Sequence, residues 1–190
     1  MPKLGMEPIR RDAIVKATIA ELGANKSLDV TVSQIAKRAG ISSALAHHYF
    51  GGKDQIFLAA MRRIMSDFGA EAVTELNKAA PDQRAQAIIR ACFAPSCFTA
   101  DATRAWMTFY VLAQTNDSAL QLWRVYQRRI RSNLRHAFRG QTDDPDAAAR
   151  TLIALIDGLY IRAALTAPGE PREAVDHALR VLDMLLKDQP

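Results

Sequence analysis

Residues 31–53 read TVSQIAKRAGISSALAHHYFGGK, and this stretch predicts two short helices joined at Gly40, followed by the start of a third helix. Thr31 and Gln34 have the spacing of a capping box, in which two backbone amides are satisfied reciprocally. Gly40 can take the left-handed conformation that ends the first helix, and Ser42 can cap the second. Such a pair has the form of a helix-turn-helix, which lays its second helix in the major groove of DNA.

The second helix of this pair, about Ser43–Tyr49, is the predicted reading helix. Leu45 and Phe50 can anchor it, which leaves Ala44 and His48 facing outward. Ala44 is small enough to contact a thymine methyl group, and the free amides at the helix start attract phosphate. This reasoning predicts DNA contacts from Ser42, Ser43, Ala44 and His48, and phosphate contacts from Thr31, Ser33 and Lys53.

The adjacent His47 and His48 raise the alternative of a metal site. Neighbouring residues on a helix point about 100° apart, so the two imidazoles do not readily share one ion. No carboxylate or cysteine lies nearby in the sequence. We therefore predict no metal site and no cofactor. For Tyr49, a packing role remains open beside a role at DNA.

The formal net charge of +5 is concentrated near the helix-turn-helix. Up to Lys53 the chain has eight Lys and Arg against four Asp and Glu, a net charge of +4 for this first quarter. A basic region beside a reading helix is the footprint of a phosphate-binding face. For the charge taken by itself, a merely soluble basic surface is the alternative.

The composition predicts an ordered cytoplasmic protein. Of the 190 residues 49% are apolar, and no apolar run reaches transmembrane length. Charge follows the first residues at once, unlike the start of a signal peptide. Cys92 and Cys97 fit no standard zinc spacing, and cytosolic thiols are normally reduced. We expect two buried small side chains there, with a redox switch as the alternative.

Helical periodicity predicts an all-α fold of about nine helices, because no stretch alternates as a strand would. A DNA-binding head of three helices, residues 1–53, would precede a helical ligand-binding and dimerisation domain, residues 54–190. The helices expected outside the helix-turn-helix pair span about Pro8–Gly23, Asp54–Lys78, Asp82–Phe93, Ala102–Gln114, Ser118–Arg139, Asp146–Ala167 and Pro171–Lys187.

The last two of these helices predict a homodimer. The penultimate helix is apolar nearly all round, and such a helix must be covered on two sides. One side would face the ligand domain and the other a partner subunit, in a four-helix bundle. Burial inside a monomer is the alternative. The residues predicted for this interface are Leu152, Leu155, Leu159, Val175, Leu179, Leu182 and Leu186.

The segment 93–134 is dense in aromatic residues and holds both tryptophans of the chain. Asp157 is a carboxylate in an otherwise apolar helix, where a charge is costly without a partner. Aromatic faces beside a carboxylate suit a quaternary ammonium ion. The predicted ligand-binding residues are Trp106, Phe109, Tyr110, Trp123, Tyr126, Asp157 and Tyr160. The alternatives are an ordinary aromatic core and an Asp157 that pairs with an arginine.

The helix-turn-helix segment resembles the N-terminal signature of the TetR family of repressors. The matching residues are Thr31-Val32-Ser33, Ile35-Ala36, Ala39-Gly40-Ile41-Ser42, Tyr49-Phe50 and Lys53. The resemblance implies a TetR-like fold in which His47 and Tyr49 occupy phosphate-clamping positions. It also implies a homodimer that binds a palindromic double-stranded operator and responds to a small-molecule effector.

Three further segments resemble the choline-sensing repressors of glycine betaine synthesis within that family. They are residues 2–11, residues 105–110 (AWMTFY) and residues 155–165 (LIDGLYIRAAL). The resemblance implies a repressor of an osmoprotectant pathway that choline releases from DNA or weakens on it. The rival is a repressor of the same family with another effector, such as a lipophilic cationic drug.

Two other classes of protein are alternatives to this interpretation. The sequence has no nucleophile elbow, metal-ligand spacing, glycine-rich phosphate loop or paired carboxylates, so we predict that the chain is not an enzyme. A non-specific basic architectural protein would not need an aromatic-rich C-terminal two-thirds.

Overall fold

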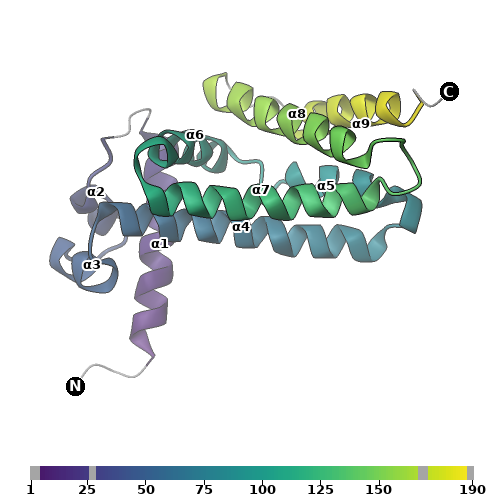
Figure 1. The fold of residues 1–190 in the computed structure, drawn as a ribbon. Helices are drawn as coiled ribbons and strands as arrows, with labels where there is room; N and C mark the ends of the chain where they lie inside the picture. The colour runs from purple at the N-terminus through teal and green to yellow at the C-terminus, as the bar shows by residue number, and fades with distance from the viewer. Residues whose placement is uncertain (1–4, 26–28, 167–170, 188–190) are drawn as a thin grey trace.

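A computed structural model describes residues 5–25, 29–166 and 171–187 of the chain. These residues form nine α-helices, one 3-10 helix and no β-strand, which confirms the expected all-α class. Three helices form a head at one end of an elongated molecule (Figure 1). They are α1 (Met6–Ala24), α2 (Val32–Arg38) and α3 (Ser43–Phe50).

The remaining helices form the body, and α4 joins it to the head (Figure 1). They are α4 (Lys53–Lys78), the 3-10 helix (Pro81–Gln83), α5 (Arg84–Cys92), α6 (Ala100–Thr115), α7 (Asp117–Ala137), α8 (Pro145–Leu165) and α9 (Pro171–Lys187). Their ends lie within a few residues of the expected ones, except that the segment expected to start at Asp82 is divided into the 3-10 turn and α5. The expected end of α8 at Ala167 lies outside the described residues.

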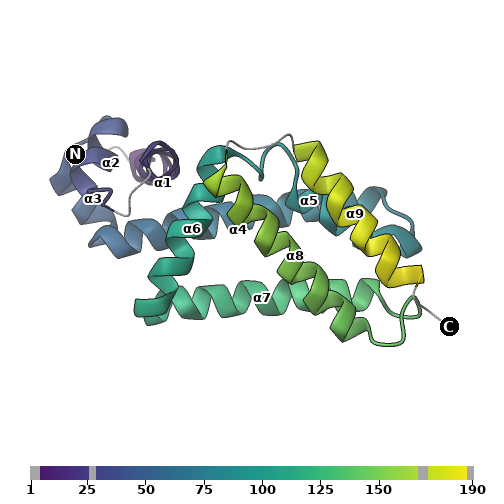
Figure 2. The ribbon, with the colours of Figure 1, turned by 90° about the horizontal axis from the view of Figure 1, so that it is seen from above.

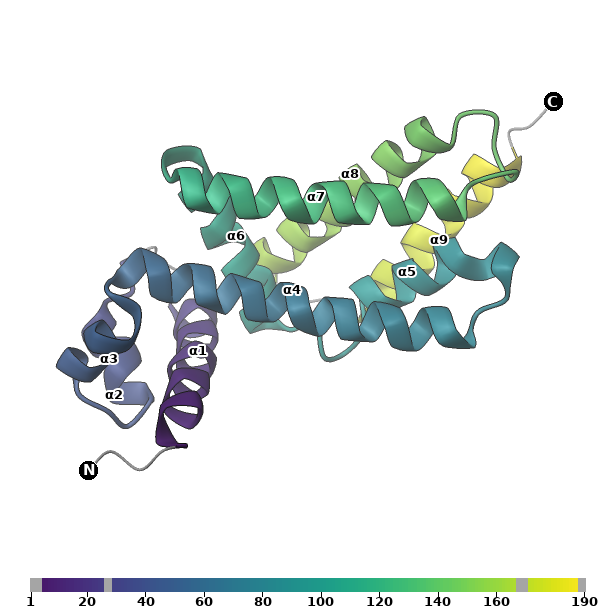
Figure 3. The same cartoon turned by 60° about the horizontal axis from the view of Figure 1, so that its bottom comes forward.

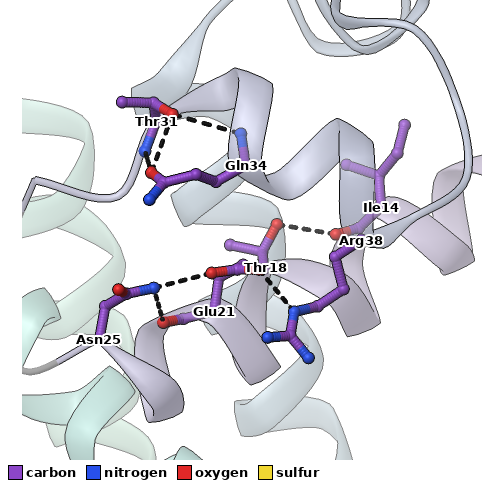
Figure 4. A network of polar contacts seen from close by, with 7 residues as sticks. All are labelled: Ile14, Thr18, Glu21, Asn25, Thr31, Gln34 and Arg38. Atoms are coloured by element: carbon purple, nitrogen blue, oxygen red, sulfur yellow. Dashed lines mark hydrogen bonds and ion pairs between the residues drawn. The ribbon is translucent and has the colours of Figure 1, made fainter.

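Local capping sets the ends of α2 and α3. The Thr31 hydroxyl accepts from the Gln34 amide at 3.2 Å, while the Thr31 amide donates to Gln34 Oε1 at 2.7 Å (Figure 4). This reciprocal pair confirms the predicted capping box. Gly40 has a φ of 69°, as the turn requires, and Ser42 Oγ accepts from the Leu45 amide at 3.2 Å.

Leu45 and Phe50, the expected anchors of the reading helix, are both partly buried, and Phe50 packs against the core. The small Ala46 is fully buried and is the one α3 residue in the centre of the core. An alanine at this position lets α3 approach its neighbours closely, because no larger side chain has to be accommodated.

Glu21 of α1 ties the first helix to the helix-turn-helix. Its side chain is buried, and it accepts from Arg38 Nε of α2 at 2.6 Å and from Asn25 Nδ2 at 2.7 Å (Figure 4). A buried carboxylate is stable only when such partners replace water. This network fixes the position of α2 relative to the end of α1.

The same end of α1 packs against the start of α6. The Arg104 side chain of α6 donates to the Gly23 carbonyl, and a Cβ at Gly23 would lie 2.6 Å from the Asp101 Cα and closer still to its carboxyl group. Glycine is therefore required at position 23 by the close approach of two helices.

Polar contacts also tie α4 to its neighbours at the head end. Arg63 donates to Asp12 of α1 at 2.6 Å. Asn116, the N-cap residue of α7, donates to Asp54 in the first turn of α4 at 3.0 Å. The helix that follows the reading helix is thus held by both α1 and α7.

In the body, α8 crosses α6 and α7, and α9 lies over α5 (Figure 2). The core between them is filled by large side chains with little or no exposed surface. Among these are Phe93, Phe109, Leu134, Phe138, Leu152 and Leu182. Within the described residues, no helix combines the length and hydropathy that a membrane span requires.

Replacing Gly23 with alanine tests the α1–α6 contact. The added Cβ would overlap Asp101, including its backbone, so we expect Gly23→Ala to lower the free energy of unfolding by about 1–3 kcal/mol. Urea denaturation followed by circular dichroism measures this change.

Gly69→Ala in α4 is the matched control, because a Cβ there meets no atom within 4 Å. Alanine loses less conformational entropy than glycine on folding, so this variant should gain about 0.4–1 kcal/mol. Equal effects of the two substitutions would contradict the close approach at Gly23.

Candidate DNA-reading face and effector site

The reading helix α3 lies at the outer end of the head (Figure 3). Ala44, His47 and His48 are exposed, and Ser43 is half-buried at the helix start. The predicted base-contacting residues therefore lie at the surface, on a helix that both its cap and Ala46 hold in place.

Tyr49 differs from these residues because it is partly buried and packs against the core. The guanidinium of Arg11 from α1 lies 5.7 Å from the Tyr49 ring centroid and 5.0 Å from that of Phe50. The packing role that the sequence left open for Tyr49 thus has structural support. Arg11 is not predictable from the sequence, since no local pattern indicates which side chain will cover a ring.

The predicted phosphate contacts surround α3. Ser33 and Ser42 are exposed, and Lys53 begins α4, with its Nζ 5.4 Å from the Phe57 ring centroid. Thr31 is exposed as well, but its hydroxyl lies 2.8 Å from Gln34 Oε1, to which it donates. Because its hydroxyl proton is already used in this hydrogen bond, Thr31 serves mainly as the N-cap of α2.

In the body, α6, α7 and α8 bring most of the predicted ligand-binding residues together in an aromatic cluster. The Trp106 ring centroid lies 4.9 Å from that of Tyr126, 5.7 Å from Tyr110, 5.8 Å from Phe109 and 6.4 Å from Tyr160. Phe93 and Phe98, which were not predicted, extend the cluster through Tyr160. The Tyr160 hydroxyl donates to the Cys92 carbonyl.

Asp157 lies at the edge of this aromatic cluster and is held by neutral groups. The Tyr110 hydroxyl donates to its Oδ1 at 3.1 Å, and Gln127 Nε2 donates to its Oδ2 at 3.3 Å. Burial raises the pKa of Asp157, while these two hydrogen bonds lower it by less. The alternative of an arginine partner is not realised: among the described residues, no ion pair includes Asp157.

Trp123 is apart from the aromatic cluster and lines a cavity of about 280 Å³ between α7 and α8. Gln127 and Asp157 line the same cavity, so it reaches the carboxylate from outside the cluster. Three arginines, Arg128, Arg131 and Arg150, also line it, and the last two both pair with Asp146.

The predicted dimerisation residues fall into two groups. Leu152 and Leu182 are fully buried inside the chain, so they cannot face a partner, and this part of the prediction is corrected. Helical periodicity alone could not separate the inward stripe from the outward one. The half-buried residues are Leu155, Leu159, Val175, Leu179 and Leu186.

Exposed apolar side chains also lie on α8 and α9. Leu165 is 74% exposed, Met184 63% and Ile161 36%. Such side chains on neighbouring helices are a feature of surfaces that bind another protein. They were not among the residues chosen for the interface.

Cys92 and Cys97 are buried free thiols, as expected. Burial raises the pKa of both, which disfavours the reactive thiolate. In the part of the chain that the structure describes, no three His, Cys, Asp or Glu side chains gather as metal ligands would.

Two family models match separate parts of the chain. Residues 14–60 match the bacterial regulatory proteins of the tetR family, and residues 81–187 match the C-terminal part of BetI-type transcriptional repressors. The first match contains the helix-turn-helix, and the second contains the aromatic cluster and Asp157.

Curated relatives agree with both matches. The HTH-type transcriptional regulator BetI of Brucella suis biovar 1 (strain 1330) is 48% identical over 170 residues, which cover 88% of this chain and 86% of that protein. The HTH-type transcriptional regulator BetI of Agrobacterium fabrum (strain C58) is 43% identical over 194 residues, which cover 100% and 94%.

A solved structure of a transcriptional regulator from Saccharomonospora viridis in complex with choline has a TM-score of 0.76 to this fold. It is 22% identical, with coverage of 91% of this chain and 95% of that one, so its likeness bears on the fold alone. The matched families and relatives are regulators and not enzymes, as the sequence predicted. This chain belongs to the TetR family of transcriptional regulators and, within it, to the BetI-type repressors.

Proposed function

We propose that this protein represses genes for the synthesis of glycine betaine from choline, and that choline releases it from DNA or weakens its binding. The observation that carries the choice of effector is Asp157, a largely buried carboxylate with two neutral partners beside an aromatic cluster. The sequence resemblance to choline-sensing repressors supports it, as does the choline complex of the Saccharomonospora viridis regulator.

The chemistry of choline suits these groups. Its trimethylammonium head cannot donate or accept an ordinary hydrogen bond, but each aromatic face can contribute about 0.5–2 kcal/mol to holding it. Asp157 supplies the opposite charge, and Tyr110 and Gln127 orient its carboxylate. The cavity lined by Trp123 reaches Asp157, and two of the three arginines that line it, Arg131 and Arg150, are paired with Asp146.

The path from this site to DNA runs through α6 and α1. The helix that carries Trp106 and Tyr110 begins at the contact between Asp101 and Gly23. Two residues before Gly23, Glu21 binds Arg38 of the helix-turn-helix. A shift of α6 that accommodates choline would therefore move α1 and the reading helix together.

The effector acts by shifting a population. Choline can weaken DNA binding only through its different affinities for the two forms, and such coupling is typically about 1–3 kcal/mol. The half-buried and exposed apolar residues of α8 and α9 would form the homodimer interface. A dimer presents two reading helices to adjacent major grooves, roughly 34–36 Å apart.

The first experiment is fluorescence anisotropy with the DNA upstream of the protein's own gene, at fixed salt. We expect specific binding that choline weakens about 5- to 150-fold. Glycine betaine should have little effect, because its own carboxylate opposes Asp157. Specific DNA binding that choline leaves unchanged but a lipophilic cation weakens would favour the rival effector. The absence of any specific DNA binding would contradict the assignment as a repressor.

Asp157→Asn tests the charge at the site. Removing the carboxylate should weaken choline binding about tenfold or more, since two opposite unit charges about 4 Å apart attract each other by about 4 kcal/mol at an effective dielectric constant of about 20. Choline affinity of the wild type should also fall on acidification, because the raised pKa of Asp157 brings its protonation to a higher pH. Isothermal titration calorimetry at several pH values measures both effects, and unchanged affinity in the variant would exclude Asp157.

The same variant has a stability signature. A carboxyl group whose pKa is raised by folding makes the native state more stable as the pH falls towards its unfolded pKa. Without ligand, Asp157→Asn should therefore be more stable than the wild type at neutral pH, and this difference should shrink in acid.

Two alanine variants separate the two kinds of DNA contact. Lys53→Ala should weaken binding to operator and random DNA alike and lower the salt slope by about one, as expected for a phosphate contact. His48→Ala should instead reduce the preference for the operator. Lys78→Ala, at the other end of α4, is the matched control and should change neither. Equal losses for the His48 and Lys53 variants on both DNAs would contradict this assignment.

A further inference from the structure

A groove of about 580 Å³ lies between α4 and α7 and shares no lining residue with the cavity at Asp157. The two helices run side by side from the head (Figure 3). Apolar side chains from both helices form its walls, and the outward ends remain accessible: Val73 is 58% exposed and Val125 37%. Phe68 and Tyr126, whose ring centroids lie 6.0 Å apart, contribute aromatic surface.

The charges that line this groove have one sign. Arg62 of α4 and Arg129 of α7 lie along it, and none of the described residues that line it is an aspartate or glutamate. From Ser118 to Arg139 the sequence has six arginines and no acidic residue. Among the described residues, the ion pairs of α4 and α7 involve Arg63, Lys78 and Arg131, and neither groove arginine takes part.

We propose that this groove binds an amphiphilic anion, a free alkyl carboxylate, as a second ligand distinct from the quaternary ammonium. Guanidinium groups bind carboxylates through paired, charge-assisted hydrogen bonds. The apolar walls cover an alkyl chain, whose burial is favourable by about 0.8 kcal/mol per methylene group. A volume of about 580 Å³ lies within the range of small-molecule sites.

The groove differs from the site at Asp157 in its charged groups. No carboxylate of its lining residues offsets Arg62 and Arg129, which repel a cation, whereas Asp157 offers a cation a largely buried carboxylate. The groove shares only Tyr126 with the aromatic cluster, through the contact of Tyr126 with Trp106. A ligand in the groove would also lie between α4 and α7, which the hydrogen bond from Asn116 to Asp54 joins near the head.

Calorimetric titration of the full-length protein with decanoate, below its micelle concentration, tests the proposal. We expect saturable binding that the double variant Arg62→Gln/Arg129→Gln weakens at least about tenfold, while choline affinity stays unchanged. Arg90→Gln/Arg139→Gln removes the same charge from exposed positions outside the groove, and it should leave decanoate binding intact. Val73→Glu places a negative charge on the exposed wall and should abolish binding without disturbing the core.

Four results would overturn the proposal. Equal losses of decanoate affinity in the two double arginine variants would show that only the net charge of the protein matters. Decanol or decyltrimethylammonium binding as tightly as decanoate would remove the role of the two arginines. Unchanged decanoate binding by the Val73→Glu variant would show that the ligand binds outside the groove. A change in oligomeric state on Val73→Glu, seen by analytical ultracentrifugation, would make the groove an interface between copies of the chain.

Discussion

The close approach of α1 to α6 at Gly23 is the contact on which the arrangement of this protein depends. The two helices come so near that position 23 has no room for a Cβ, and the Arg104 side chain holds the carbonyl of the same residue. On one side of this contact, Glu21 binds Arg38 of the helix-turn-helix. On the other side, α6 carries Trp106 and Tyr110. Head and body therefore meet where neither can move without the other.

The aromatic cluster adds a second constraint, which concerns charge. Asp157 is largely buried, and among the described residues Tyr110 and Gln127 are the ones that donate to it. Keeping an unneutralised carboxylate there raises the energy of the ligand-free protein. A bound cation removes that cost. The carboxylate that destabilises the ligand-free protein therefore stabilises its complex with a cation. This is the physical basis for proposing a cationic effector here.

The sequence predicted what depends on neighbours along the chain. The capping box of Thr31 and Gln34, the turn at Gly40 and the cap at Ser42 are decided within a few residues. It placed Asp157 and Tyr110 in one site, but it could not predict that Tyr110 and Gln127, from two other helices, would donate hydrogen bonds to the Asp157 carboxylate. Leu152 and Leu182 were assigned to the wrong side of their helices for the same reason, since periodicity gives a stripe but not the partner that covers it.

Reciprocal linkage tests the central claim, that the Asp157 site and the reading helices are coupled through α6 and α1. Calorimetry would measure choline affinity with and without saturating operator DNA, in the wild type and in Arg104→Ala, which removes the side chain bound to Gly23. The operator should weaken choline binding in the wild type by the same factor as choline weakens operator binding. In Arg104→Ala that factor should move towards one. A choline affinity that is identical with and without operator in the wild type would contradict the account.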